Sequence, residues 1–492
     1  MGFDYFDRVR HLRTGIRVYS DLLIEKSLDV WNIKTRIGLF FFSLALSIAG
    51  AYFLSPEEFT QAQTYTLFVL FFAILLWATE AIPPFAVGIF ILGFLIYTMR
   101  NIEGATVSPE VISNTWSDSV IWIFLGGFFL SEGMRKTNLD ISLFKFSVSL
   151  FGNRPKFLLL GIIVVTSILS LIISNTATAA MVLASVMPLL DNEGKKSPIA
   201  KAILISIPVA ATFAGMASLI SSPPNLIVVD SLKSKGFDIS FNDWMVLGLL
   251  PAVLLLAGFW YSVTKKYLKD TRPVDLSFLD VRIIKTKKMR LQRLFVISIL
   301  LITVFFWMMG HQWHIPTSGT ALIPIMFLPM LGVITAEDVR KLPWDTLMLV
   351  AGGLALGIAI KELLAPYFST YLSSFQFNKI VMMMIFGVTT IIFSNIMSST
   401  ATATIIINIA AVVLPASQIL PVALVVGLCS SCGLFLPVST PPNAIVFGTG
   451  MLKQSDFHLG GIYGGVVGLA IAILWILFLD YFTPFTTSLI MG

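Results

Sequence analysis

Apolar runs long enough to cross a lipid bilayer recur along almost the whole chain. About 20 predominantly apolar residues span the hydrocarbon core as a helix. Such runs predict crossings at residues 37–54, 63–83, 84–99, 118–138 and 243–264, and again at 293–310, 316–334, 344–362 and 458–480. Between them lie an amphipathic stretch at 140–152, two apolar hairpins at 156–190 and 379–415, and two interrupted segments at 199–236 and 418–452. The pattern predicts an all-α polytopic membrane protein.

Three landmarks within these stretches occur twice. They are SNTATAAM from Ser174 and SSTATATI from Ser398, SSPPNLIVV from Ser221 and STPPNAIVF from Ser439, and the pairs Gly126-Gly127 and Gly352-Gly353. The three landmarks keep one order and recur at nearly the same offset along the chain, which indicates an internal duplication. Interrupted apolar segments at matching places in two halves are typical of the substrate site of a secondary transporter.

Basic residues predict how the two copies are oriented, because cytoplasmic loops are rich in Lys and Arg. Residues 1–36 hold seven basic residues and Lys265–Arg293 holds ten, so both are expected in the cytoplasm. The first repeat, residues 63–264, then makes five crossings plus a re-entrant hairpin, and the second, residues 293–480, does the same upside down. With the first crossing this gives about 11 transmembrane helices. The remaining parts are the first crossing with its connection at 37–62, a basic linker at 265–292 and a tail at 481–492.

Composition supports the membrane class and excludes others. The chain is 56% hydrophobic and 12% charged, whereas a soluble domain carries about 25% charged residues. Its first 36 residues contain no apolar h-region, so no cleavable signal peptide is expected. Cys429 and Cys432 lie in an apolar run where packing is expected rather than redox chemistry. No phosphate loop or nucleophile–base pair predicts an enzyme, and the net charge of +6 reflects the cytoplasmic loops rather than nucleic-acid binding.

The repeated motifs have a chemistry of neutral oxygens and free amides. No charged residue lies between Lys156 and Asp191 or between Lys379 and Lys453. The double prolines break the helix and leave backbone carbonyls free, which suits a hard cation, while the restarting helix offers amide N–H groups to an anion. Without a fixed negative charge, such a site is expected to bind Na⁺ and an anion together. The alternative is that small polar residues merely pack one helix against another.

The motifs resemble those of the divalent-anion/sodium symporter family, which includes dicarboxylate and citrate transporters. The resemblance rests on WATEAIPPF at Trp77, WIFLGGFFLSEGMRK at Trp122, ISNTATAAM at Ile173, LISSPPN at Leu219, WDTLMLVAGGLALGIAI at Trp344, SSTATATI at Ser398 and LPVSTPPNAIVFGTG at Leu436. It implies a homodimer in a lipid bilayer, with a scaffold domain and a transport domain that moves as an elevator.

The resemblance also implies the site residues. A first sodium site would use Ser170, Ser174, Asn175 and the backbone of Ser221, and a second would use Ser394, the carbonyl of Met397, Ser399 and the backbone of Ser439. Substrate carboxylates would contact Ser174, Asn175, Thr176, Ser222, Ser398, Ser399, Thr400 and Thr440. One position departs from the family pattern: Ser399 stands where an asparagine is expected, with Asn395 nearby as a possible substitute.

These features predict Na⁺-coupled uptake of a small dicarboxylate such as succinate or malate across a bacterial-type inner membrane, with a cytoplasmic N-terminus. Na⁺ is the co-transported ion and no organic cofactor is expected. A Na⁺-independent anion exchanger, or a symporter for another divalent anion such as sulfate or citrate, is the alternative that Ser399 leaves open. A substrate-sensing receptor or an integral-membrane hydrolase would be a different class, and no motif in the chain favours either.

Overall fold

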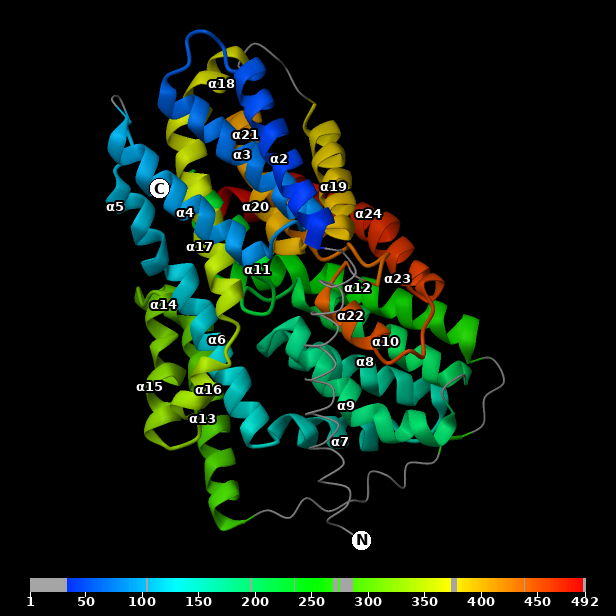
Figure 1. The fold of residues 1–492 in the computed structure, drawn as a ribbon. Helices are drawn as coiled ribbons and strands as arrows, with labels where there is room; N and C mark the ends of the chain where they lie inside the picture. The colour runs from blue at the N-terminus through cyan, green and yellow to red at the C-terminus, as the bar shows by residue number, and fades with distance from the viewer. Residues whose placement is uncertain are drawn as a thin grey trace.

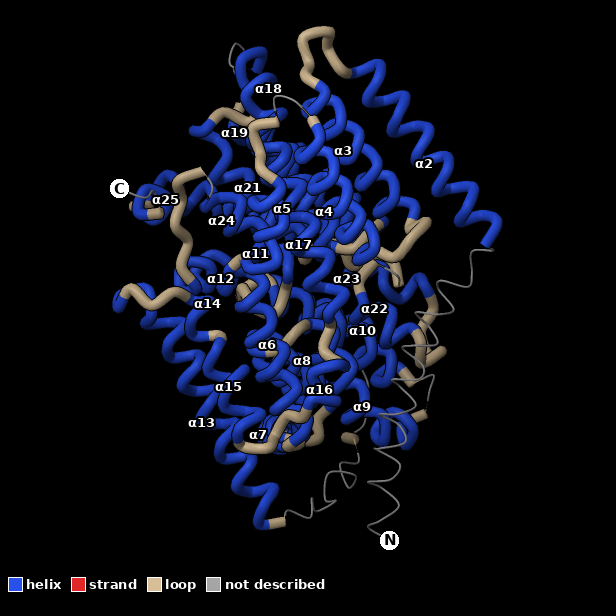
Figure 2. The backbone as a smooth tube through the Cα atoms, turned by 60° about the vertical axis from the view of Figure 1, so that its left-hand side comes forward, coloured by secondary structure: helices blue, strands red, loops and turns tan. Residues whose placement is uncertain are grey.

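The computed structural model describes residues 33–102, 105–194, 197–233, 235–268, 273–274, 286–372, 378–437 and 439–489. Within these ranges the chain is helical and forms no β-strand, as Figure 2 shows. Among the described residues, nine helices are long and apolar enough to cross a membrane. The predicted all-α polytopic membrane protein is therefore confirmed. The predicted segment 1–36 lies outside the described residues up to residue 32, as do most of the linker 265–292 and the end of the tail 481–492.

The helices of the first half follow the predicted order closely. They are α2 (Ile33–Leu54), α3 (Gln61–Thr79), α4 (Pro84–Asn101), α5 (Pro109–Ser113), α6 (Ser119–Lys136), α7 (Leu139–Phe151), α8 (Pro155–Ile172), α9 (Asn175–Glu193), α10 (Pro198–Gly215), α11 (Pro223–Lys233) and α12 (Phe241–Tyr267). Several begin with a proline at the first helical position, where the missing amide hydrogen costs nothing. The amphipathic stretch, the hairpin and the interrupted segment correspond to α7, α8–α9 and α10–α11.

The helices of the second half come in a similar order. They are α13 (Lys287–Met309), α14 (Thr317–Thr320), α15 (Leu322–Met330), α16 (Ala336–Arg340), α17 (Trp344–Ala359), α18 (Ala365–Leu372), α19 (Lys379–Ile396), α20 (Ser399–Val413), α21 (Ala416–Ser430), α22 (Pro441–Phe447), α23 (His458–Ile462), α24 (Leu469–Phe482) and α25 (Phe485–Ser488). One predicted boundary is wrong. The crossing expected to end at residue 362 continues through a π-turn at Ile360–Leu364 into α18, because two charged residues, Lys361 and Glu362, end the apolar run but not the helix.

The helices form two groups that draw on both halves of the chain (Figure 1). One group contains α3, α4, α6, α13, α15 and α17, each of which packs against at least one other member, with α2 at the outer edge. The other contains α8 to α12 and α19 to α24. Helix α10 is the most enclosed of the nine candidate spans, with 89% of its most apolar stretch buried. Because α10 leads into the first helix break, that break lies well inside the second group.

Close glycine contacts hold the first group together across the two halves. A Cβ atom on Gly352 of α17 would lie 2.3 Å from the Cα of Gly88 in α4, and a Cβ atom on Gly126 of α6 would lie 2.7 Å from the Cβ of Ala321. These helices approach so closely that only a hydrogen fits at the two glycine positions. The first glycine of each Gly-Gly pair is therefore a packing position between the two halves, whereas Gly127 and Gly353 pack against Ile220 and Thr404 of their own halves.

Further contacts between the two halves lie at the end of α6 and at the π-turn after α17. The Arg293 guanidinium at the start of α13 donates to the carbonyl oxygens of Thr137 and Asn138 at 2.6 and 2.5 Å. In the other direction, Gln63 at the start of α3 donates to the carbonyl oxygen of Leu363 at 2.9 Å. Thr137 and Leu363 are as far apart along the chain as the two Gly-Gly pairs are. Arg293 of α13 thus caps carbonyls at the end of α6, and Gln63 of α3 bonds to the π-turn that follows α17, each across the two halves.

An ion pair fastens the same end of α6. Lys136 Nζ lies 2.8 Å from Oδ2 of Asp338 in α16, and Asp338 also accepts hydrogen bonds from the amide and hydroxyl of Thr335. Burial opposes ionisation of Asp338, but these hydrogen bonds outweigh it and hold the pKa of the carboxyl at about 2, below its ordinary value of 3.8.

Candidate functional site

Both hairpins turn at the repeated serine motif. Ser174 and Ser398 are the N-cap residues of α9 and α20, and their hydroxyl oxygens accept hydrogen bonds from the amides of Ala177 and Ala401 at 3.3 and 3.2 Å. Serine favours this position because its side chain satisfies an amide at the helix start that has no partner within the helix. The predicted hairpin tips therefore form at the same residue in both repeats.

In the first repeat, three predicted cation ligands come together. The Ser170 hydroxyl lies 2.7 Å from Oδ1 of Asn175 and 2.7 Å from the carbonyl oxygen of Ala211, so its single proton is shared between two acceptors. The backbone amide of Asn175 donates to the carbonyl oxygen of Ser221 at 3.4 Å. The tip of the hairpin is thus bonded directly to the unwound segment between α10 and α11.

Gly215 leaves the space that the Asn175 side chain occupies. A Cβ atom on Gly215 would lie 2.1 Å from Oδ1 of Asn175, so any larger residue at the end of α10 would displace the carboxamide. The position of Asn175 therefore depends on a glycine in the neighbouring broken helix.

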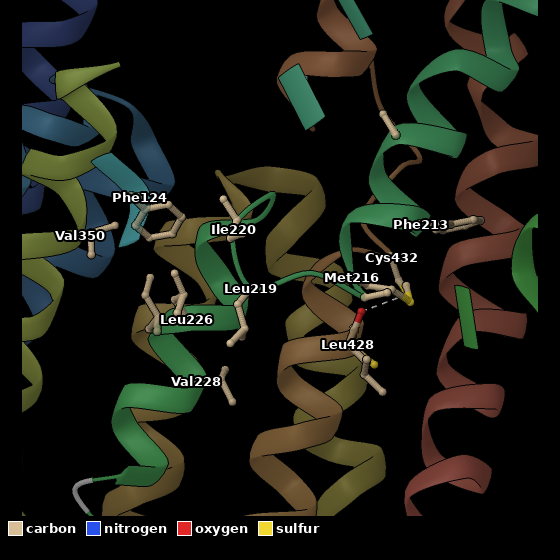
Figure 3. Close-up of a cluster of buried hydrophobic side chains, with 14 of the residues drawn as sticks. Phe124, Phe213, Met216, Leu219, Ile220, Leu226, Val228, Val350, Leu428 and Cys432 are labelled. Carbon is tan, nitrogen blue, oxygen red and sulfur yellow. Dashed lines mark hydrogen bonds between the residues drawn. The ribbon is translucent and has the colours of Figure 1, made fainter. Parts of the chain in front are cut away.

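Beyond Gly215 the unwound segment is held at several points. Ser218 donates to the carbonyl oxygen of Leu171 at 2.8 Å, and Trp244 donates to that of Met216 at 3.0 Å. Figure 3 shows this segment with Met216, Leu219 and Ile220 along it. The unwound chain is thus fixed both to the first hairpin and to α12.

The unwound segment of the second repeat has its own hydrogen bonds. The Ser439 hydroxyl donates to the carbonyl oxygen of Leu436 at 2.8 Å. Thr440 is the N-cap of α22, and its hydroxyl accepts a hydrogen bond from the backbone amide of Asn443 at 3.3 Å. The side-chain amide of Asn443 donates to Leu436, Leu434 and Ser439. Both unwound segments are therefore ordered by local side chains.

The two hairpin tips are not equivalent. Ser394 corresponds to Ser170 and is fully buried, but its hydroxyl has no hydrogen-bond partner among the residues that the structure describes. Ser399, at the position of Asn175, therefore does not bond to Ser394 in the described part of the chain. The contact made by Ser170 with Asn175 therefore has no counterpart in the second repeat, because serine is too short to supply the carboxamide.

Asn395 does not replace the missing carboxamide. Its Nδ2 donates to the carbonyl oxygen of Ile391 at 2.8 Å, and its Oδ1 accepts the amide of Phe435 at 2.7 Å. Both polar atoms are thus used to join α19 to the unwound segment. Asn395 therefore makes no contact with the Ser394 hydroxyl, and its part in a cation site stays a prediction.

The other predicted site residues differ in exposure. Ser221, Ser222, Met397, Thr400, Ser439 and Thr440 are buried, Ser174, Asn175, Ser398 and Ser399 are partly buried, and Thr176 is exposed. Helix α9 packs against α22, and α11 packs against α20. Each hairpin therefore lies beside the broken helix of the other repeat, which brings all four polar motifs to one region.

Sequence reasoning missed two residues of this region, Asn225 and Asn443. Each is fully buried and donates to backbone atoms of the unwound segment in its own repeat. The signal was present, because both asparagines belong to the repeated Pro-Pro-Asn motif. The prolines predict a helix break, but they do not predict what the asparagine beside them contacts.

Comparison with known proteins decides the family. The model of the sodium:sulfate symporter transmembrane region matches residues 21–483 of the chain. The chain belongs to this family. It is therefore an integral membrane protein from a family of transporters, and not an enzyme. The resemblance inferred from the motifs is confirmed.

Comparisons with individual proteins are consistent with this family. The chain is 27% identical over 490 residues to the sodium-dependent dicarboxylate transporter SdcS of Staphylococcus saprophyticus, covering 92% of this chain and 93% of the relative. It is 28% identical over 468 residues to SdcS of Staphylococcus aureus strain USA300, covering 88% of both. The crystal structure of the YdaH transporter of Alcanivorax borkumensis resembles the fold with a TM-score of 0.55 at 13% identity, covering 82% of this chain and 99% of that one.

Proposed function

We propose that this protein is a secondary active transporter that couples Na⁺ to the uptake of a small dicarboxylate such as succinate or malate. The observation that carries the proposal is the cluster of four uncharged polar motifs at two pairs of helix breaks, joined in the first repeat by the hydrogen bonds of Ser170, Asn175 and Ser221. Relatives named as sodium-dependent dicarboxylate transporters, aligned over most of their length, support the substrate class.

In this proposal the first cation site consists of Ser170, Ser174, Asn175 and the backbone of Ser221. The second consists of Ser394, the carbonyl of Met397, Ser399 and the backbone of Ser439. Substrate carboxylates contact the hairpin tips at Ser174, Asn175, Thr176, Ser398, Ser399 and Thr400, and the unwound segments at Ser222 and Thr440. The hydroxyl, carbonyl and carboxamide oxygens of these residues are the ligands that a hard cation prefers.

The absence of a fixed negative charge at the site couples the binding of Na⁺ to the binding of the anion. Taking Na⁺ out of water into a site of neutral oxygens costs free energy that no carboxylate between Lys379 and Lys453 can offset. A dicarboxylate bound beside the cation supplies that negative charge, and the cation in turn offsets the charge of the anion. Each ligand then raises the affinity of the other by the same factor.

The two helix groups support an elevator mechanism, and the protein is proposed to act as a homodimer. The group with α3, α4, α6, α13, α15 and α17, tied by glycine contacts across the repeats, is proposed as the scaffold, and the group that contains both breaks as the transport domain. The repeats keep the proposed limits 63–264 and 293–480. The N-terminus is proposed to face the cytoplasm of a bacterial-type cell, with the protein in the inner membrane.

One observation favours a second candidate function. Ser394 is buried without a hydrogen-bond partner in the described part of the chain, and Ser399 offers no carboxamide, so the second cation site is weakened. A protein with such a site could exchange anions without Na⁺, or carry another divalent anion such as sulfate or citrate.

Uptake by reconstituted vesicles tests the proposal. Purified protein in proteoliposomes is given radiolabelled succinate, malate, citrate or sulfate under an inward Na⁺ gradient, with choline replacing Na⁺ as control. Succinate or malate uptake that needs Na⁺ supports the proposal. Equal counterflow in Na⁺ and choline would instead favour the exchanger.

A further inference from the structure

Two buried asparagines occupy the same place in the two repeats. Asn225 is the third residue of α11 and Asn443 the third residue of α22, and each follows a double proline. Both are fully buried, and in both the carboxamide oxygen has no hydrogen-bond partner among the described residues. Burying a carboxamide is costly unless hydrogen bonds compensate for the lost water, so the contacts of its amide end show what it is used for.

The side-chain amide of Asn225 faces the end of α10. Its Nδ2 lies 2.8 Å from the carbonyl oxygen of Ser218, 3.0 Å from that of Gly215 and 3.4 Å from that of Met216. Carbonyls at the end of a helix have no partner within the helix, and here they are enclosed by protein. The asparagine therefore satisfies the carbonyls where α10 unwinds and fixes the path of the chain beyond it.

Asn443 makes the same contacts in the second repeat. Its Nδ2 lies 2.9 Å from the carbonyl oxygen of Leu436 and 3.3 Å from that of Leu434. Leu434 and Leu436 stand at the positions that Met216 and Ser218 hold in the first repeat, by the same offset that relates the two asparagines. The contact is thus a property of the repeat and not of one loop. Asn443 also donates to the Ser439 hydroxyl at 3.3 Å.

A short chain of hydrogen bonds joins Asn225 to the proposed cation ligands. The carbonyl oxygen of Gly215 accepts from Asn225 and also from the Ser221 hydroxyl at 3.0 Å. The carbonyl oxygen of Ser221 in turn accepts the amide of Asn175. Asn225 and Ser221 therefore share one acceptor, although Asn225 is not itself a proposed ligand.

We propose that Asn225 and Asn443 are positioning residues, which hold the two unwound segments so that Ser221 and Thr440 face the transported ions. Asn225 sets the affinity for Na⁺ at the first cation site, and Asn443 sets the affinity for the anion at Thr440. The inference rests on the proposed function and adds two residues to it. Loss of a hydrogen-bond partner that orients a ligand to a metal ion typically lowers the affinity by about 10- to 100-fold.

Graded variants of Asn225 test the first part. Asn225→Leu keeps the size of the side chain and removes its donors, and Asn225→Ser keeps one donor in a smaller side chain. Ser206→Ala is the control, because Ser206 is also fully buried on α10 but its hydroxyl has no partner among the described residues. Uptake of succinate into proteoliposomes is titrated with Na⁺ at saturating succinate, and the amount of folded protein is measured separately.

The half-saturating Na⁺ concentration is expected to rise about 10- to 100-fold in Asn225→Leu and less in Asn225→Ser, and to stay unchanged in Ser206→Ala. A purely structural role would lower the maximal rate with the amount of folded protein and leave half-saturation where it is. If Asn225→Leu does not fold, the Ser variant alone decides, and half-saturation equal to that of the parent overturns the inference.

Asn443→Leu tests the second part in the same vesicles. The half-saturating succinate concentration at saturating Na⁺ is expected to rise at least about fivefold, because leucine removes the side-chain hydrogen bonds to Leu436 and Ser439 that hold the chain just before Thr440. An unchanged value would overturn the role of Asn443. A parent protein that ignores Na⁺ would overturn the proposed function and this inference together, whereas a Na⁺-dependent parent with unchanged variants would overturn the inference alone.

Discussion

The hydroxyl of Ser170 lies 2.7 Å from Oδ1 of Asn175, five residues further along the chain and across the tip of the first hairpin. In the second repeat the corresponding residues are Ser394 and Ser399, and the Ser394 hydroxyl has no partner among the described residues. The two hairpin tips thus share the serine cap of the helix but not the carboxamide. This difference between the repeats gives two predictions about cation binding.

The first prediction concerns Asn175. If its side chain contacts both Na⁺ and substrate, Asn175→Ala abolishes Na⁺-driven succinate uptake, because alanine has no side-chain oxygen to replace that of the carboxamide. The protein should still fold, since the backbone amide that donates to Ser221 is retained. Uptake within twofold of the parent, measured in reconstituted vesicles at equal protein, would remove Asn175 from the site.

The second prediction concerns Ser399. Ser399→Asn restores the carboxamide beside Ser394, and the buried hydroxyl then gains a partner. The half-saturating Na⁺ concentration for dicarboxylate uptake should fall, or its Na⁺ dependence should become steeper. Titrating both proteins with Na⁺ at fixed substrate measures this. If neither the midpoint nor the steepness changes, position 399 does not face a cation site.

The third prediction concerns the packing between the repeats. Gly352→Ala places a methyl group 2.3 Å from the backbone of Gly88, so one helix must move. Overpacking of this kind costs roughly 1–3 kcal/mol, and the melting temperature of the purified protein should fall. Gly93→Ala on α4 is the matched control, because a Cβ atom there has open space. Equal melting temperatures for Gly352→Ala and the control would mean that α4 and α17 are not in close contact.

The fourth prediction concerns the ion pair of Lys136 and Asp338. Because the pKa of Asp338 in the folded protein, about 2, lies below its ordinary value, the stability that it contributes is present above about pH 4 and is lost as pH falls toward 2. Asp338→Asn should therefore lower the melting temperature at pH 7, and its difference from the parent should shrink below pH 4.

A neighbouring carboxylate provides the control for this measurement. Glu337→Gln changes a fully exposed side chain whose ion pair with Lys341 lies on the surface, so it should have little effect on the melting temperature at either pH. A constant difference between Asp338→Asn and the parent from pH 7 to pH 3 would contradict the assigned pKa.

Most of the fold could be predicted because a bilayer imposes strong rules on sequence. The length of each apolar run predicts a crossing, and α11 and α22 begin at the double prolines, at Pro223 and Pro441. The prediction was wrong where charge interrupts a helix without ending it, as at Lys361 and Glu362. Periodicity and hydropathy do not register a π-turn, because its hydrogen bonds depend on the local backbone and not on composition.

The candidate site was predictable in its residue types and less so in its contacts. The repeated motif indicated Asn175, but not that Gly215 leaves room for its side chain or that the Ser221 carbonyl accepts its amide. The roles of Asn225 and Asn443 depend on where the unwound backbone passes, which only the folded structure defines. Sequence also could not tell that the polar atoms of Asn395 are already used.

Na⁺ and a dicarboxylate are proposed to bind together at a site without fixed charge. Calorimetric titration of the purified protein with succinate, in Na⁺ and in choline at equal ionic strength, measures this coupling directly. Na⁺ is expected to raise the succinate affinity about 5- to 150-fold, and succinate to raise the Na⁺ affinity by the same factor. Equal succinate affinity in Na⁺ and in choline would contradict it.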